Sequence, residues 1–249
     1  MAKKQPRRFF IFIIVLIICV CLVALYIIKR GAIYSASKLK DCQVAPETEF
    51  CGIKQINLSI PESIQNEILT AADNVNFGKR VVLTGWKGGR TIATASIIES
   101  LPNVWDWYIG LQTQISKEIG ATVTNTQDFL PTTCSILVYE NDGDFINWHY
   151  DVNYFQGRFF TLIVPVTFAD NCTEYTYIDK EGANQNIKNK KGTSILFEGD
   201  KVFHMATKFC TKGGTRKRVV VSMQFATDST ISLYNRALMR IKDTAYIGF

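Results

Sequence analysis

The chain has 249 residues, of which 47% are hydrophobic and 20% charged, a composition that excludes a largely disordered protein. The formal net charge of +6 is unevenly distributed, because the first 40 residues hold eight basic residues and no acidic ones. The rest of the chain carries a net charge of −2. It lacks the basic footprint of a nucleic-acid-binding protein, so we expect no nucleic-acid partner.

The N-terminus combines a basic tail, residues 1–8, with an unbroken run of 20 apolar residues from Phe9 to Ile28. A helix of that length rises about 30 Å, the thickness of the hydrocarbon core of a bilayer. No small-residue cleavage site follows, so the run is typical of a single transmembrane signal-anchor rather than a cleaved signal peptide. Basic residues at both ends make the positive-inside bias slight, but the short tail favours an N-inside orientation. We therefore expect a single-pass membrane protein whose C-terminal domain faces the lumen or the exterior.

Residues 29–57 are interpreted as a stalk. Cys42 and Cys51 flank a short polar stretch and suit a disulfide in an oxidising compartment, with unpaired thiols as the open alternative. Asn57 and Asn171 each begin an Asn-x-Ser/Thr triplet, which predicts a glycoprotein if the domain is luminal or exterior. The cysteines form no Cys-x-x-Cys pair, so a zinc site is not expected.

The remaining residues, 58–249, are predicted to form one domain, with helices first and strands after. Apolar residues recur at helical spacing over residues 61–72 and 104–119. After Leu130, turn signals separate short β-rich runs over residues 134–139, 145–151, 159–168, 175–178, 193–197, 201–205 and 218–226. Residues 231–241 are predicted as a closing helix. This order predicts an α+β domain in which helices pack on one face of a β-sandwich or barrel.

Both histidines of the chain belong to one candidate metal site. His149 and Asp151 are two residues apart, so on a strand their side chains would point to the same side, and His204 would join them from another strand. Two imidazoles and one carboxylate on one face of an octahedron leave three positions open, which is the arrangement of non-haem Fe(II) oxygenases. The alternative for His149, whose His-x-Asp motif is weak alone, is a packed and hydrogen-bonded strand histidine.

The surrounding residues resemble, in order, the double-stranded β-helix (jelly-roll) core of the prolyl 4-hydroxylase-like 2-oxoglutarate/Fe(II)-dependent dioxygenases. Tyr139 lies ten residues before His149, and the stretch Arg158 to Thr161 resembles the family's Arg-x-x-Thr strand. KKGTSILFEGDKVFH resembles the family's Gly-rich turn, strand and distal histidine, and GTRKRVVVSMQF resembles its last strand. The resemblance covers residues 58–227 and departs from the family where residues 172–176 replace a Gly-Gly-x-Thr segment.

The resemblance implies a 2-oxoglutarate- and Fe(II)-dependent dioxygenase (hydroxylase) that uses O2 and ascorbate. It makes His149, Asp151 and His204 the catalytic and metal-binding residues. It also implies that a basic residue on the last strand binds the far carboxylate of 2-oxoglutarate, which needs a charged and preferably bidentate donor. Arg218 is preferred to Arg216 because it lies deeper in the strand, and the alternative for either is a solvated charge at a strand end.

Two further contacts of the co-substrate are predicted at Tyr139 and Thr161, with core packing as the alternative for the tyrosine. Alternate residues of the last strand share one face with Arg218, whereas Lys217 is expected to face the other way.

The resemblance implies a polypeptide substrate, with prolyl and lysyl side chains as first candidates. Trp148, Tyr150, Tyr154 and Phe155 are expected either to pack a prolyl ring or an aliphatic stem, or to fill the β core. The alternative function is a non-catalytic, membrane-tethered structural or binding protein on a degenerate oxygenase fold. Iron-dependent formation of succinate would separate the two. The sequence does not indicate an oligomeric state.

Overall fold

The structure is a computed structural model that describes residues 10–22, 39, 42, 50–80, 86–126, 129–168, 174–209 and 216–239. Residues 10–22 form a helix inside the predicted transmembrane run, and the rest of that run lies outside the described residues. Within the described ranges, no helix combines the length and apolar character needed to cross a bilayer. The basic tail, most of the stalk and Asn171 also lie outside the described residues.

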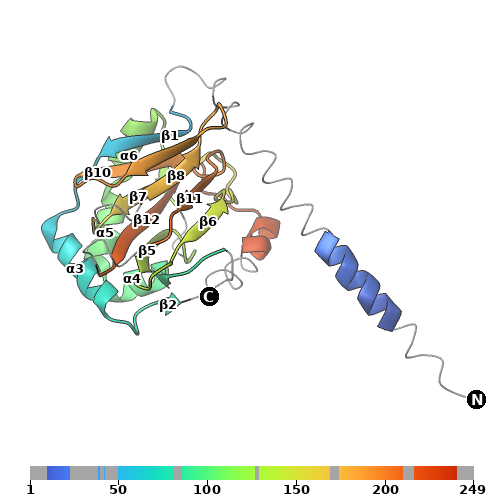
Figure 1. Cartoon of the computed structure of the whole chain (residues 1–249). Coiled ribbons are helices and arrows are strands. Elements are labelled where there is room, and N and C mark those ends of the chain that lie inside the picture. Colours follow the sequence, from blue (N-terminus) through green and yellow to red (C-terminus); the bar gives the residue numbers. More distant parts are fainter. Residues whose placement is uncertain are drawn as a thin grey trace, which may run out of the picture.

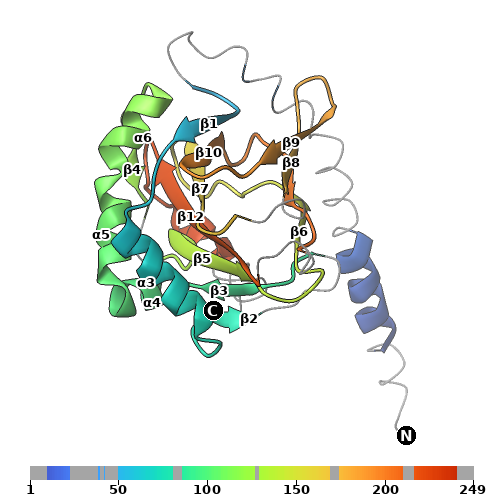
Figure 2. The same ribbon diagram turned by 60° about the vertical axis from the view of Figure 1, so that its left-hand side comes forward.

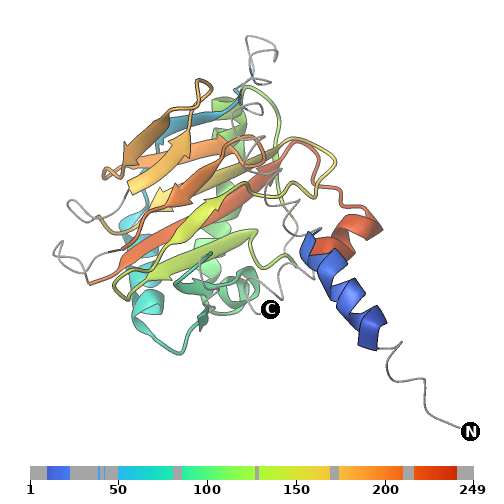
Figure 3. The same ribbon diagram turned by 45° about the vertical axis from the view of Figure 1, so that its right-hand side comes forward.

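Two antiparallel sheets form the centre of the domain (Figures 1 and 3). The larger has the strand order β1 (Ile53–Asn57), β10 (Thr193–Glu198), β7 (Phe159–Pro165), β12 (Arg218–Ala226), β5 (Cys134–Tyr139), β3 (Arg90–Ile92) and β2 (Lys79–Arg80), with β4 (Thr124–Asn125) paired to β12. The smaller has the order β6 (Ile146–His149), β11 (His204–Ala206), β8 (Glu174–Ile178) and β9 (Asn184–Lys188).

Helices cover the outer face of the larger sheet, so the domain has three layers, as Figure 2 shows. They are α3 (Glu62–Asp73), α4 (Thr94–Ser100), α5 (Pro102–Gly110) and α6 (Gln112–Ile119). A further helix spans residues 233–239. The main hydrophobic core lies between the helices and the larger sheet and is formed by side chains such as Ile68, Tyr108, Ile115, Leu162 and Val221.

Alternation along the strands gives the larger sheet two different faces. On β12, Val219, Val221 and Met223 point into the core under the helices, whereas Arg218 and Ser222 line a cavity on the other side. Strands β5 and β7 alternate in the same way. Because side chains of a strand alternate between its faces, one sheet can bury an apolar core and still present polar groups to a site.

Several predicted elements are confirmed and others are corrected. The bounds of β5 and β12 match the predicted strands, and α3 matches the first predicted helix within a residue. The predicted helix 104–119 is two helices, α5 and α6, which separate at Leu111 next to the poor helix former Gly110. Helix α4 and strand β9 were not predicted, and β9 occupies residues that begin in an expected turn.

The predicted stalk ends too late in the sequence. Strand β1 lies within it, yet pairs with β10 over its whole length, and the backbone N–H of Phe50 donates to the carbonyl of Ile119. The folded domain therefore begins upstream of residue 58. A disulfide joins Cys42 to Cys51, as the spacing of the two cysteines allowed.

Candidate metal centre and its cavity

The three predicted metal ligands lie together at the edge of the smaller sheet. His149 ends β6 and His204 begins β11, and the two residues are partners in the strand register, with ring centroids 4.2 Å apart. Asp151 follows the end of β6, and its Oδ1 lies 3.6 Å from Nε2 of His149. One donor atom from each residue lies within 4.8 Å of the other two. The aspartate reaches the site from a loop, however, and not from the strand that the sequence spacing predicted.

Backbone carbonyls fix the orientation of both imidazole rings. Nδ1 of His149 lies 2.6 Å from the carbonyl oxygen of Asn147, and Nδ1 of His204 lies 3.0 Å from that of Val202. In each case the carbonyl belongs to the residue two positions earlier. A ring that donates its Nδ1 proton to a carbonyl keeps the Nε2 lone pair for a metal.

Asp151 is held at its carboxylate and at its backbone. Its Oδ2 accepts a hydrogen bond from Oγ1 of Thr161 at 2.6 Å, and its backbone N–H donates to the carbonyl of Gly199 at 3.0 Å. A Cβ on Gly199 would lie 2.9 Å from Cβ of Asp151. The site therefore needs a glycine here for space, and Oδ1 of Asp151 is left for a metal.

Aromatic side chains bury the distal histidine. Tyr175 stacks on the ring of His204 with centroids 5.1 Å apart and planes at 17°, and Phe197 meets the ring edge-on at 4.7 Å. Burial lowers the pKa of His204 below its ordinary value, against the opposing effects of the Asp151 carboxylate and the Val202 carbonyl. The ring is therefore neutral at physiological pH, the form in which it binds metals.

Tyr175 itself lines the site. Its hydroxyl is buried and has no hydrogen-bond partner within the described part of the chain. Burial first, and then the nearby Asp151 carboxylate, raise the pKa of Tyr175 well above its ordinary value.

A cavity of about 610 Å³ opens beside the three ligands and extends between the two sheets. Its wall includes Arg218 of β12, so the cavity joins the candidate metal centre to a buried cation. Trp86 and Val152 also line it and are 43% and 47% exposed, which places them at its mouth.

Arg218 is only 4% exposed and lies opposite Tyr139 in the register of β12 and β5. Its guanidinium carbon lies 3.7 Å from the centroid of the Tyr139 ring. Its Nε and Nη2 atoms are buried without a hydrogen-bond partner among the described residues. Burial lowers the pKa of Arg218, and Tyr139 and Asp144 oppose this effect. A buried donor without a hydrogen-bond partner lowers the stability of the fold. An anion that enters the cavity would supply the missing partner, so this guanidinium is suited to bind one.

The other residues predicted to bind the co-substrate are placed differently. Arg216 is exposed, lies before the first residue of β12 and is not part of the cavity wall. Thr161 lines the cavity, but its hydroxyl is used by Asp151. Lys217 faces away from the cavity, as predicted, and its Nζ lies 3.0 Å from both the carbonyl oxygen of Ala72 and a carboxylate oxygen of Asp73.

Most of the predicted aromatic wall belongs to other parts of the domain. Tyr150 lines the cavity. Trp148 instead stacks on Phe203 with centroids 5.3 Å apart, because it alternates with His149 along β6. Tyr154 and Phe155 are buried in a second hydrophobic cluster and fill the core.

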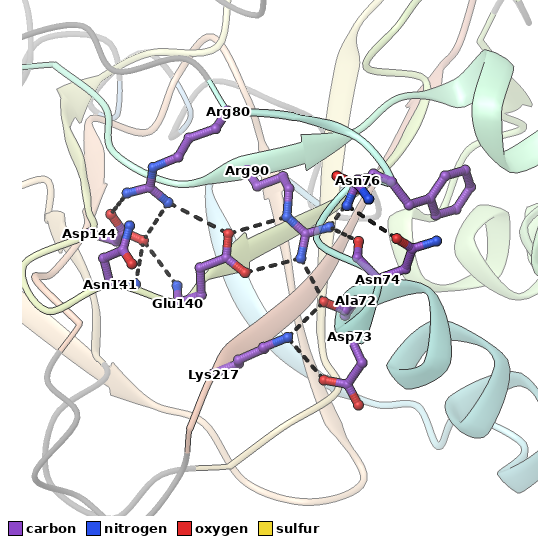
Figure 4. A network of polar contacts seen from close by, with 11 residues as sticks. Ala72, Asp73, Asn74, Asn76, Arg80, Arg90, Glu140, Asn141, Asp144 and Lys217 are labelled. Carbon is purple, nitrogen blue, oxygen red and sulfur yellow. Dashed lines mark hydrogen bonds and ion pairs between the residues drawn. The ribbon is translucent and has the colours of Figure 1, made fainter.

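A polar network supports the loop that leads from β5 to the ligand strand β6, and Figure 4 shows it. Asp144 accepts hydrogen bonds from the backbone N–H of Glu140 and from the guanidinium of Arg80. The buried guanidinium of Arg90 binds both carboxylate oxygens of Glu140, at 3.2 and 3.1 Å, and also carbonyls at the C-terminal end of α3. These bonds fix the chain five residues before His149.

Three residues of the site were missed by sequence reasoning. Two of them lie at positions that the sequence marks. Gly199 belongs to the Glu-Gly-Asp turn before the distal histidine, and Tyr175 belongs to the segment that replaces the family's Gly-Gly-x-Thr. The third, Lys87, carries no such mark in the sequence. It is 5% exposed, lines the cavity and donates to Oγ1 of Thr91 at 2.9 Å.

The donor set fits the metal that the resemblance implies. Two neutral imidazole nitrogens and one carboxylate oxygen are the ligands of non-haem Fe(II) sites, and the cavity leaves space on their open side. The cavity also fits 2-oxoglutarate. The buried guanidinium of Arg218 lines it, and two nitrogen atoms of this guanidinium have no hydrogen-bond partner among the described residues, so they can bind a carboxylate.

No protein-family model matches the sequence, and no curated protein matches it either. Solved structures do resemble it. A prolyl-4-hydroxylase from Pseudomonas putida is 13% identical with a TM-score of 0.52, and the match covers 78% of this chain and 98% of that one. A Trichoplax adhaerens prolyl hydroxylase, solved with a peptide fragment of hypoxia inducible factor, is 15% identical with a TM-score of 0.51. The match covers 86% of this chain and 96% of that one. A non-haem, α-ketoglutarate-dependent epimerase of nogalamycin biosynthesis is 12% identical with a TM-score of 0.56. The match covers 76% of this chain and 82% of that one.

At these identities the comparisons establish the fold. The domain has the antiparallel, jelly-roll fold of the 2-oxoglutarate/Fe(II) oxygenases, with prolyl hydroxylases among the structures that it resembles.

Proposed function

We propose that this chain is an Fe(II)- and 2-oxoglutarate-dependent dioxygenase that hydroxylates a polypeptide side chain, with prolyl and lysyl residues as first candidates. One observation carries the proposal: the three-residue donor set and the unpaired guanidinium of Arg218 line the same cavity. A metal site alone would suit many proteins. The combination with a buried anion site matches a co-substrate that chelates a metal at one end and carries a second carboxylate at the other.

Bound Fe(II), together with 2-oxoglutarate and O2, would supply the oxidising power to hydroxylate an unactivated C–H bond. The residues of the chain bind and orient. His149, Asp151 and His204 offer Nε2, Oδ1 and Nε2 on one side of the cavity, and the carbonyls and Thr161 behind them keep these atoms in place. Apolar side chains such as Ile163 and Phe197 line the cavity and exclude water from the reacting groups.

Arg218 would hold the far carboxylate of 2-oxoglutarate through its two unpaired nitrogen atoms. The guanidinium carbon lies 3.7 Å from the centroid of the Tyr139 ring, and this contact restricts the position of the guanidinium. Arg216, exposed and outside the strand, would take no part.

A polypeptide substrate is supported by two observations. One solved structure with this fold is a prolyl hydroxylase in complex with a peptide fragment. The exposed Trp86 and Val152 at the mouth of the cavity offer apolar contacts to a chain that lies across the opening.

The proposal includes the membrane anchor at residues 9–28, an N-inside orientation and a luminal or exterior domain. The side chain of Asn57 is exposed on β1, so an oligosaccharyltransferase can reach it after or during folding. Glycan addition at this residue in microsomes would support the orientation. Digestion of the domain by a protease added outside sealed microsomes would reverse it.

The activity is tested with the full-length chain in detergent, supplied with Fe(II), ascorbate and labelled 2-oxoglutarate. We expect iron-dependent formation of succinate, stimulation by a proline-rich or lysine-rich peptide, and a gain of one oxygen atom in the mass of that peptide. His204→Ala should abolish succinate formation, whereas Arg216→Ala should leave it unchanged. Absence of succinate from metal-loaded wild-type protein would favour the non-catalytic alternative. Stimulation only by a lipid or a free metabolite would retain the oxygenase and reject the peptide substrate.

A further inference from the structure

The hydroxyl of Tyr175 is the most conspicuous polar group beside the metal ligands that the proposed mechanism does not use. Tyr175 is 7% exposed, stacks on the ring of His204 and lines the cavity. The Asp151 carboxylate is near enough to act on it electrostatically. The phenol therefore lies against the ligand side of the cavity, whereas Arg218 lies on the larger sheet.

Packing explains the ring of Tyr175 but not its oxygen. The hydroxyl has no hydrogen-bond partner in the described part of the chain. A buried donor without a partner destabilises the fold, and phenylalanine would fill the same space beside His204 and Phe197 without that cost. The hydroxyl is neutral and protonated at physiological pH, so it is a donor that needs an oxygen acceptor. A ligand at the open side of the metal site would supply one.

We propose that Tyr175 is a positioning residue whose hydroxyl donates a hydrogen bond to the carboxylate with which 2-oxoglutarate chelates the metal. This rests on the proposed function and deepens it. The co-substrate would then be held at both ends, by Tyr175 of the smaller sheet near the metal and by Arg218 of the larger sheet at the far carboxylate. The stacking of Tyr175 on His204 links the donor rigidly to a metal ligand, so the carboxylate and the metal are aligned together.

Pyruvate separates the two ends, because it keeps the keto-acid group and lacks the far carboxylate. Dissociation constants of 2-oxoglutarate and of pyruvate are measured by anaerobic titration of the full-length Fe(II)-loaded protein, followed by the absorption band of the keto-acid–Fe(II) complex. Tyr175→Phe should weaken both ligands by about tenfold or more, since a charge-assisted hydrogen bond is lost. Arg218→Ala should weaken 2-oxoglutarate by a similar factor and leave pyruvate unchanged.

Tyr177→Phe is the matched control, because it removes a hydroxyl two residues along the same strand from a side chain that is not part of the cavity wall. It should bind both ligands as the wild type does. Affinity for Fe(II) alone should be unchanged in Tyr175→Phe, which keeps the stacked ring.

Equal affinities of Tyr175→Phe and wild type for both ligands would overturn the inference. So would a Tyr175→Phe variant that binds both ligands normally and loses only the stimulation by peptide, because the hydroxyl would then serve the substrate. If wild-type protein binds neither 2-oxoglutarate nor pyruvate in the presence of Fe(II), the proposed function itself fails.

Discussion

Thr161→Val tests the support of the metal site directly. The substitution keeps the shape of the side chain in β7 and removes the hydroxyl that donates to Oδ2 of Asp151 at 2.6 Å. The Asp151 carboxylate then loses a partner inside the cavity wall and can turn away from the histidines. Loss of a hydrogen bond to a charged group costs about 1.5–3 kcal/mol, and partners of metal ligands are typically worth about 10- to 100-fold in metal affinity. We expect the affinity for the metal to fall by about this factor.

Mn(II) is a suitable probe, because the signal of the free ion in electron paramagnetic resonance gives the dissociation constant without turnover. Thr161→Ser restores the hydroxyl and should bind Mn(II) within a few-fold of the wild type. At saturating Fe(II), Thr161→Val should require no more 2-oxoglutarate than the wild type. The reasoning fails if Thr161→Val binds Mn(II) normally. A raised requirement for 2-oxoglutarate alone would return Thr161 to the co-substrate contact that the sequence predicted.

Three further outcomes follow from the structure. Arg218→Ala should raise the concentration of 2-oxoglutarate needed for half-maximal succinate formation by about 10- to 150-fold, and Arg216→Ala should not; equal effects would contradict the assignment. Gly199→Ala places a methyl 2.9 Å from Cβ of Asp151 and should lower Mn(II) affinity by about tenfold or more. Unchanged affinity for Mn(II) would show that the backbone of the turn can shift without moving Asp151. Arg90→Leu removes a guanidinium that is 2% exposed, leaves buried backbone carbonyls such as that of Ala72 without this donor and leaves Glu140 with Arg80 at 3.7 Å as its remaining ion pair, so urea unfolding should show a loss of about 3–5 kcal/mol; a neutral result would mean that water replaces the guanidinium.

The spacing of apolar and polar residues along the chain predicts much of the fold. Strands β5 and β12 have the bounds that the sequence predicted, because each contains at least two β-branched residues and an aromatic one and lies between turn signals. The two-residue alternation also predicted that Arg218 and Lys217 face opposite ways, and they do. The donor set could be proposed because the chain has only two histidines, one of them two residues from an aspartate.

Short and polar strands could not be predicted from local pattern. Strand β9 consists of the residues NQNIK, is exposed along most of its length and exists because it pairs with β8. The sequence around β1 predicts a stalk, and only the pairing of β1 with β10 shows that it belongs to the sheet. Pairing partners far apart in the sequence decide such segments, and their intrinsic preference is weak.

The roles of individual side chains also depended on long-range contacts. Thr161, a predicted contact of the co-substrate, lines the cavity and donates a hydrogen bond to Asp151 that the sequence did not indicate. Tyr154 and Phe155 were candidates for a substrate wall but fill the core. The sequence by itself determined the candidate ligands, the alternating strands and the apolar run at residues 9–28, since each of these depends on the spacing of neighbouring residues. Only the tertiary structure decided that Tyr175 lies on His204 and that Arg218 shares a cavity with the ligands, because these contacts join residues that are far apart in the sequence.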